Sequence, residues 1–204
     1  PVVQEEVATG EDAAAAAADR VGYPVALKLL SNDIAHKSDI GGVELGLADA
    51  GAVRAAWRRI MAAVAERRPD ARVEGVVVQA MARGPEFLVG LTRDATFGAV
   101  LTLGLGGIYT ELFRDVSLRV LPVDRPMVEE MLGELRSAPL LAGFRGAPPV
   151  DRDGFVDMVL ALAELFESHR YLAELELNPV VVGNRGCTAV DGLASIADEL
   201  ETVT

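Results

Sequence analysis

The chain has 204 residues, of which 50% are hydrophobic and 25% are charged, and its formal net charge is -12. This balance predicts a globular protein with an apolar core, built as one large domain or two small lobes. The negative charge argues against nucleic acid or an anionic membrane as a partner, because both bind basic surfaces. No stretch is long and apolar enough to span a bilayer, and no signal peptide opens the chain, so we expect a cytoplasmic location.

The first part of the sequence predicts a strand, a helix and a hairpin. Residues 1–7 are typical of a strand, and the alanine-rich segment from Glu11 to about Gly22 is typical of a helix with acids in its first turn. Strands are expected at 25–29 and 43–46, on either side of a polar loop. The sequence starts without an initiator Met, which favours a fragment of a longer chain.

The remainder mixes helices with strands that follow one another closely. Helices are expected at 49–67, 126–135 and 151–168, where apolar residues recur at helical spacing. Strands are expected at 73–81, 86–93, 98–103, 115–123, 172–177 and 187–190. Interleaved hairpins and helices predict an α+β fold, or an α/β fold with antiparallel pairs. The glycine-rich segment 104–107 matches neither the dinucleotide-binding fingerprint nor the P-loop.

Lys28 is one of only two lysines among 19 basic residues, the other being Lys37. On a strand it shares a face with Ala26 and Leu30, and a charge among apolar neighbours is costly unless it is paired. An anionic ligand would supply that pair. The alternative is an edge-strand lysine whose ammonium group extends to water.

The loop 36–42 carries a histidine, a cation, a hydroxyl group and two glycines. Backbone N–H groups in such a loop can close over phosphates, and the neutral imidazole of His36 can accept a phosphoryl group. The alternative is a solvated turn. Trp57 and Cys187 are expected to be structural residues, the first in a helix that packs on the core and the second in a strand.

Polar residues alternate with apolar ones near the C-terminus. Glu174, Glu176 and Asn178 project from one face of the expected strand, and Asp191 follows on the next strand. Three carboxylates and an amide oxygen suit a hard cation such as Mg²⁺. The alternative is the solvent face of a two-stranded ribbon.

Five motifs in this order resemble the ATP-grasp domain of NDP-forming acyl-CoA synthetases, the group of ADP-forming acetate–CoA ligases and the succinyl-CoA synthetase β subunit. They are PVALK at 24–28, HKSDIGGV at 36–43, GLGGIYTE at 104–111, ELELNP at 174–179 and VD at 190–191. Each is weak alone, but together they cover nearly the whole chain. The family usually has Asp at the position of Glu176.

The resemblance implies an ATP-grasp fold of the α+β class, with two lobes of mixed or antiparallel sheet and helices that grip ATP. It implies one domain over 1–204 without the family's first helix, with lobe 1 at 20–78 and lobe 2 at 79–204, and with residues 1–19 belonging to lobe 2. It implies ATP and Mg²⁺ as cofactors. The residues it assigns are His36 in the phosphoryl relay; Lys28, Gln79, Ala80, Met81 and Glu86 on the nucleotide; and Glu176, Asn178 and Asp191 on the metal.

The resemblance also implies that the segment 104–111 and Arg119 line the phosphoryl-transfer pocket. The family reaction forms acyl-CoA, ADP and phosphate from an acid, CoA and ATP through a phosphohistidine. The primary histidine belongs to a CoA-binding ligase domain in the same chain or another subunit, so the isolated domain is not expected to complete the reaction, and the full-length protein is expected to be an oligomer. Two alternatives stay open: a nucleotide-sensing domain fused to a protein acetyltransferase, and a scaffold with an inert pocket.

Overall fold

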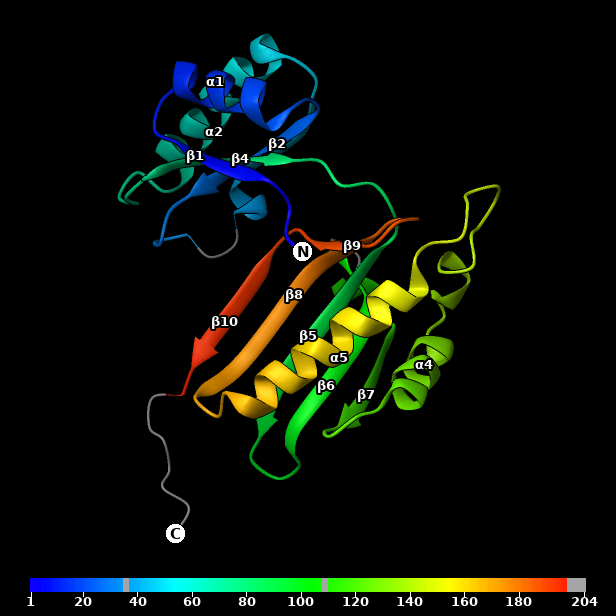
Figure 1. Ribbon diagram of the computed structural model, residues 1–204. Helices are drawn as coiled ribbons and strands as arrows, with labels where there is room; N and C mark the ends of the chain where they lie inside the picture. Colours follow the sequence, from blue (N-terminus) through cyan, green and yellow to red (C-terminus); the bar gives the residue numbers. More distant parts are fainter. Residues whose placement is uncertain (35–36, 108–109, 198–204) are drawn as a thin grey trace. The chain divides into compact units, whose positions relative to one another are not determined.

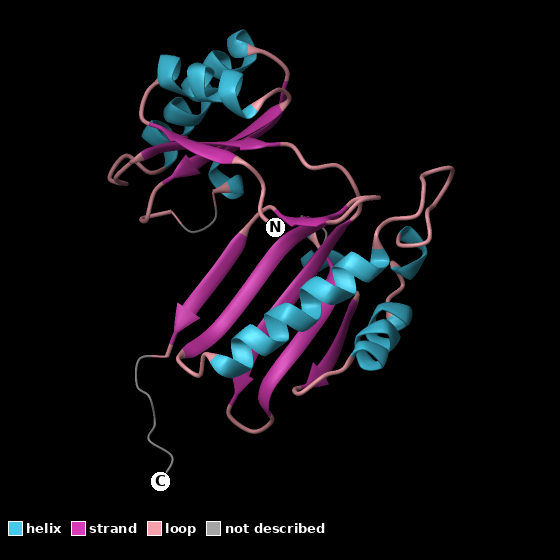
Figure 2. Cartoon of the chain, viewed as in Figure 1, coloured by secondary structure: helices cyan, strands magenta, loops and turns pink. Residues whose placement is uncertain are grey.

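The structure is a computed structural model that describes residues 1–34, 37–107 and 110–197, with the backbone alone at position 111. The chain forms two compact units. The N-terminal unit comprises Val3–Met81, and the C-terminal unit comprises Pro1–Val2 and the described residues from Ala82 onward. Each unit is a sheet with its long helices on one face (Figures 1 and 2). None of the described helices is long and apolar enough to cross a membrane.

The N-terminal unit has a four-stranded sheet in the order β1-β4-β2-β3, and all its pairings are antiparallel. Its elements are β1 (Glu5–Ala8), α1 (Glu11–Val21), β2 (Val25–Leu30), the 3-10 helix η1 (Ser38–Ile40), β3 (Val43–Leu47), α2 (Ala50–Arg67) and β4 (Gly75–Ala80). Asp49 starts α2 by accepting a hydrogen bond from the Ala52 N–H, and Gly22 ends α1 with a φ of 92°.

The core of this unit lies between the sheet and its two helices. Four alanines of α1, at 14, 15, 17 and 18, are at most 2% exposed and let the helix approach α2 and the strands closely. Alternate residues of β2, such as Leu27 and Leu29, point to this side. Trp57 is partly buried against the same core, as expected. Helices α1 and α2 both lie on this side of the sheet, so neither covers the opposite face (Figure 1).

The C-terminal unit has a sheet in the order β10-β8-β5-β6-β7, with β9 paired to β8. Its elements are β5 (Glu86–Asp94), β6 (Gly98–Leu105), α3 (Thr110–Phe113), β7 (Val116–Val120), α4 (Arg125–Glu134), the 3-10 helix η3 (Ala138–Leu140), α5 (Arg152–Ser168), β8 (Leu172–Val182), β9 (Cys187–Ala189) and β10 (Gly192–Ile196). Helices α4 and α5 cover one face, where Phe87, Phe155 and Phe166 are fully buried (Figure 2). The strand β10 was not predicted from the sequence.

The expected lobe boundary was wrong for most of residues 1–19. Strand β1 pairs with β4 from Glu5 opposite Gln79 to Ala8 opposite Val76, and α1 packs in the core of the N-terminal unit. Only Pro1 and Val2 join the C-terminal unit, where the Pro1 carbonyl accepts the Ala189 N–H. The N-terminal segment belongs to this unit because the backbone N–H and C=O groups of β1 need hydrogen-bond partners, and β4 supplies them.

Candidate functional site

Lys28 lies on the face of the N-terminal sheet that carries no helix. It is half-buried, opposite Val43 of β3 and Val77 of β4, whereas Leu27 and Leu29 point into the core. Strand β2 lies between β4 and β3, so the edge-strand alternative for Lys28 is wrong. Its neighbours on both adjacent strands are the apolar side chains of Val43 and Val77.

Gln79 lies on the same face, one strand away from Lys28. It is opposite Ala26 of β2 and Glu5 of β1, and only 3% of it is exposed. Its Nε2 donates a hydrogen bond of 2.8 Å to Glu5 Oε2. Glu5 was missed in the sequence analysis, because only the pairing of β1 with β4 brings this carboxylate to the site.

The two residues after Gln79 use their backbone N–H groups inside the unit. Ala80 donates to the Gln4 carbonyl at 2.9 Å, and Met81 donates to the Pro24 carbonyl at 3.3 Å. The side chain of Met81 is partly exposed, with 36% of the residue accessible. Both of these N–H groups are therefore already engaged in hydrogen bonds within the unit.

The glycine-rich segment of the C-terminal unit brings Glu86 and Asn178 together. The Gly106 N–H donates to the Glu86 carbonyl, and the Gly107 N–H donates to Asn178 Oδ1, both at 2.9 Å. Gly107 has a φ of 72°, and a Cβ at this position would lie 1.9 Å from Glu86 Oε2. The positive φ therefore favours glycine at 107, and a larger residue would also displace the Glu86 carboxylate from the place it occupies.

An extra residue in β8 orients Asn178. Val89 of β5 is opposite Leu177, whereas Phe87 is opposite Val180, so two steps along β5 match three along β8. Such a bulge changes the direction in which a side chain projects. The Asn178 amide Nδ2 lies 3.4 Å from Glu176 Oε1 as a donor, and its backbone N–H donates to the Asp191 carbonyl. Asn178, Glu176 and Gly107 thus form one cluster.

The acidic set is smaller than the sequence predicted. Asp191 lies in the connection between β9 and β10 rather than on a strand, and its Oδ1 accepts the Gly192 N–H. Within the described residues, no group of three or more His, Cys, Asp or Glu side chains is arranged to hold a metal ion. The expected set of three carboxylates with Glu174 is therefore wrong. The oxygen donors that remain for a cation are those of Asn178, Glu176 and Asp191.

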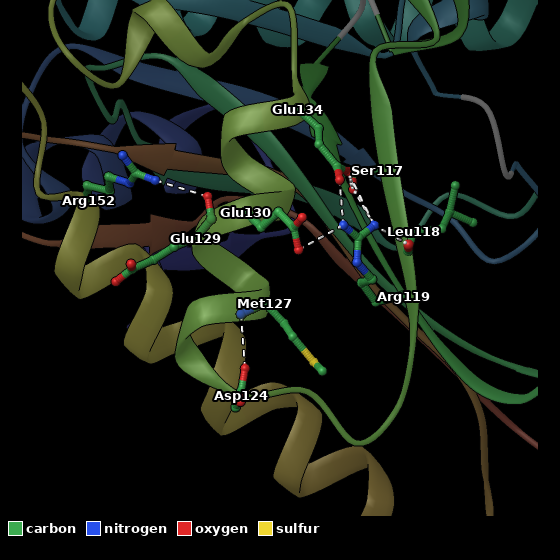
Figure 3. A network of polar contacts seen from close by, with 9 residues as sticks. All are labelled: Ser117, Leu118, Arg119, Asp124, Met127, Glu129, Glu130, Glu134 and Arg152. Atoms are coloured by element: carbon green, nitrogen blue, oxygen red, sulfur yellow. Dashed lines mark hydrogen bonds and ion pairs between the residues drawn. The ribbon is translucent and has the colours of Figure 1, made fainter.

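Arg119 was expected in the phosphoryl-transfer pocket, and this was wrong. It lies opposite Leu101, a core residue, so it projects toward the helix side of the edge strand β7. Its guanidinium group binds Glu134 at 2.5 Å and Glu130 at 3.4 Å, both on α4 (Figure 3). Ser117 also donates to Glu134, and these contacts lower the pKa of Glu134. Arg119 therefore fixes α4 to the sheet.

Asp115 is hydrogen-bonded to the glycine-rich segment and to the residues that follow α4. Its carbonyl accepts the Leu105 N–H at 3.0 Å, and its carboxylate accepts the N–H groups of Arg136 and Ser137 at 2.8 Å each. Burial raises the pKa of this carboxyl, but the hydrogen bonds from Ser137 and Arg136 outweigh it and lower the pKa overall. The sequence alone did not reveal this contact.

His36, the expected relay residue, lies outside the described residues, as do Ile108 and Tyr109 of the glycine-rich motif. Cys187 is buried in β9, and burial raises the pKa of its thiol. A raised pKa disfavours the thiolate that a nucleophile needs, in keeping with the structural role expected for Cys187.

Comparison with known proteins identifies the fold. Residues 1–196 match the family model of an ATP-grasp domain. The chain is 38% identical to subunit beta of acetate–CoA ligase (ADP-forming) II of Pyrococcus furiosus, over 93% of this chain and 81% of that subunit. It is 39% identical to acetate–CoA ligase (ADP-forming) I of Archaeoglobus fulgidus, over 95% of this chain but only 28% of that enzyme.

Solved structures agree. An acetyl-coenzyme A synthetase of Candidatus Korarchaeum cryptofilum, in complex with coenzyme A and Ca-AMPCP, superposes with a TM-score of 0.89 at 38% identity, over 97% of this chain and 86% of that one. The same enzyme with coenzyme A and Mg-AMPPCP, its phosphohistidine segment pointing towards the nucleotide binding site, gives a TM-score of 0.79 at 34% identity, over 97% of this chain and 85% of that one. The fold expected from the sequence is confirmed.

Proposed function

This chain belongs to the ATP-grasp domain family, and we propose that it is the ATP-binding part of an ADP-forming acyl-CoA synthetase. The whole protein would convert an acid, CoA and ATP to acyl-CoA, ADP and phosphate. The observation that carries the proposal is the cluster of Glu86, Gly107 and Asn178, in which three distant segments meet around a glycine of positive φ. The relatives with this domain are named as ADP-forming acetate–CoA ligases.

Lys28 is proposed to bind the nucleotide phosphates. The support is its position on an internal strand, between Val43 and Val77, on the face without helices. A lysine ammonium group is a common ligand of phosphate oxygens, which it binds as a point charge. Phosphoryl transfer depends mainly on positioning and on neutralising the phosphate oxygens, and an ammonium group supplies the second.

Gln79, Ala80, Met81 and Glu86 are proposed to contact the adenosine part of the nucleotide. The Glu86 carboxylate is exposed beside Gly107 and can accept hydrogen bonds from ribose hydroxyl groups. Gln79 is held by Glu5, which fixes the strand end that leads to Met81. The N–H groups of Ala80 and Met81 are used within the unit, so a base that binds here would contact the carbonyl groups and the Met81 side chain instead.

Mg²⁺ is proposed to bind at Asn178, Asp191 and Glu176. The donor set fits a hard cation, because all three side chains offer oxygen and Mg²⁺ is commonly bound by one or two carboxylates plus phosphates. Asn178 Oδ1 already accepts the Gly107 N–H, but an amide oxygen has a second lone pair that remains for a metal. The ion would neutralise phosphate charge during transfer.

His36 is proposed to relay the phosphoryl group to a partner domain that binds CoA and carries the primary phosphohistidine. Two relatives support a partner domain. The chain spans only 28% of the Archaeoglobus enzyme, and the Pyrococcus relative is named as one subunit, subunit beta, of its enzyme. Full-length protein would be a homo- or hetero-oligomer in the cytoplasm. No relative named above supports the regulatory alternative of an acetyltransferase fusion.

The test is the thermal shift that Mg-ATP produces in the full-length protein. A ligand that binds only the native state raises the melting temperature, so Mg-ATP should raise it for the wild type and not for Lys28→Ala. Arg58→Ala is the control. It removes one positive charge from α2 of the same unit, where Arg58 binds Glu11 at the exposed helix surface, and should keep the full shift.

An equal shift in Lys28→Ala and the wild type would remove Lys28 from the proposal, and no shift in the wild type at millimolar Mg-ATP would reject ATP binding itself.

The metal site is tested by titrating Mg²⁺ at a fixed concentration of ATP. Asp191→Asn should raise the Mg²⁺ concentration needed for half of the maximal shift, because it removes one charged oxygen ligand. An unchanged titration would exclude Asp191 as a ligand.

A further inference from the structure

Strand β7 forms one edge of the C-terminal sheet, and its outer side lacks the features that usually block pairing. It lies beside β6 and has no second neighbour among the described strands. Its register with β6 is regular from Val116 to Val120, and its sequence contains neither proline nor lysine. Proteins commonly protect an edge strand with proline, a bulge or lysine side chains, because unpaired backbone groups bind other strands. The outer edge of β7 is therefore a candidate contact surface.

The backbone groups of every second residue of β7 point away from β6. At its two ends, the Asp115 carbonyl accepts a hydrogen bond from β6 and the Leu121 N–H donates one to β6. By alternation, the backbone groups that face outward belong to the even-numbered residues, Val116, Leu118 and Val120. The Leu118 carbonyl accepts Arg119 Nη1 at 2.9 Å and keeps a second lone pair. The other outward groups have no hydrogen-bond partner in the described parts of the chain.

The side chains of the same three residues form an apolar stripe on the face of the sheet opposite α4. Val116 is 41% exposed, Leu118 54% and Val120 51%, and Figure 3 shows Leu118 pointing away from α4. Val100 of β6 extends the stripe beside Val120 and is partly buried. Single exposed apolar side chains are common, but three in succession along an open edge favour contact with another apolar surface.

The pattern of β7 is self-complementary, which indicates a second copy of this chain as the partner. On either side of Leu118 stands a polar residue, Ser117 or Arg119, followed by a valine. A two-fold axis at Leu118 would place Leu118 opposite Leu118, Val116 opposite Val120 and Arg119 opposite Ser117. No charge then lies opposite a like charge, although the chain carries a net charge of -12, and each Arg119 keeps Glu134 of its own α4.

We propose that the outer edge of β7 is a self-association surface, at which two copies of this chain pair their β7 strands antiparallel about Leu118. The contact would join two C-terminal sheets into one. It uses the unpaired backbone groups for affinity and the apolar stripe for register. One strand pair is smaller than a standard protein interface, so association should depend on protein concentration. The proposal is independent of nucleotide binding.

The experiment is disulfide crosslinking of the full-length protein, because only one register brings the named positions together. Leu118→Cys should crosslink to its own counterpart, since opposite residues of such a pair have Cα atoms about 5.5 Å apart, within reach of a disulfide. Val116→Cys and Val120→Cys should each fail alone, being about 14 Å from their own counterparts, and should crosslink when mixed. Leu193→Cys is the control, because Leu193 is 61% exposed on the other edge strand, β10, and should not crosslink.

Sedimentation equilibrium of the full-length protein then measures the association itself. Leu118→Glu should raise the Kd for self-association tenfold or more, because it places two carboxylates opposite one another, whereas Leu193→Glu should leave this Kd unchanged. Both variants should melt within about 2 °C of the wild type at concentrations where all three are dissociated, since both positions are exposed.

Three results would overturn the inference. The first is a wild type whose mass shows no association that Leu118→Glu weakens. The second is Leu118→Cys crosslinking no faster than Leu193→Cys, which would indicate random collision. The third is a crosslink from Leu118→Cys to a different polypeptide or to another segment of the same chain, which would assign the edge of β7 to that partner. None of these results bears on the proposed binding of Mg-ATP.

Discussion

The two units place their candidate site residues in different ways. In the N-terminal unit, Lys28 and Gln79 stand on the helix-free face of regular strands, where the alternation of a strand decides the side. In the C-terminal unit, Glu86, Gly107 and Asn178 meet through a strand end, a left-handed glycine and a bulge. A site on regular strands can therefore be predicted from the sequence. A site formed by a strand end, a left-handed glycine and a bulge can be found only once the course of the backbone is known.

The units also differ in what stabilises them. The N-terminal unit has an alanine-lined helix, α1, joined to α2 by surface ion pairs such as Arg58 with Glu11. The C-terminal unit has a larger apolar core with three buried phenylalanines and a buried carboxylate, Asp115, at the edge of its site. Exposed ion pairs contribute little to stability, so the two cores should carry most of it.

The largest expected change in stability comes from a substitution in the core of one unit that leaves the core of the other unit unchanged. Phe155→Ala should destabilise the C-terminal unit by about 3–5 kcal/mol, because it leaves a cavity where a fully buried ring contacts Phe87. The two core clusters share no residue, so amide exchange should accelerate in β5 but not in β2. Ile60→Ala is the matched variant for α2 and should give the reverse pattern. Equal acceleration in both sheets would show that the units unfold as one.

A smaller effect separates a buried carboxylate from an exposed one. Asp115→Asn should cost about 2 kcal/mol at pH 7, because an amide offers one acceptor where the carboxylate accepts two N–H groups. Glu44→Gln, which removes a carboxylate bound by Arg59 at the surface, should cost less.

The pH dependence has a fixed sign. The carboxyl groups of Asp115 and Glu44 both have a lowered pKa in the folded state. Each therefore contributes stability above its unfolded pKa of about 4, and this contribution is lost as the pH falls through the lower pKa of the folded state. The difference in unfolding free energy between wild type and Asp115→Asn should therefore shrink below about pH 4. A difference that stays constant down to pH 2 would contradict the role of the Asp115 charge.

The smallest effect on stability tests the glycine at the centre of the site. Gly107→Ala should cost about 1–2 kcal/mol for the left-handed backbone, and it should also displace Glu86, whose carboxylate occupies the space of the new Cβ. Gly186→Ala has a similar φ of 95° but meets no atom within 4 Å, so it should lower stability to a similar degree without weakening Mg-ATP binding. Equal nucleotide affinity in the two variants would show that Glu86 is not a ligand contact.

The sequence by itself determined the α+β class, most of the helices and strands, and the motifs by which the chain belongs to its family. These depend on hydrophobic period and on local turn residues, which act over a few positions. It also placed Lys28 on one face of a strand with Ala26, because alternation along a strand is a local property.

Only the tertiary structure decided which distant residues meet. It brought β1 and Glu5 to Gln79, moved Arg119 from the expected pocket to the helix side, and left Glu174 out of a metal cluster. Strand order, register and bulges arise from contacts between segments far apart in the chain, which no local pattern records. The open edge of β7 belongs to this second class, because the order of the strands in the sheet decides which strand is left with one neighbour.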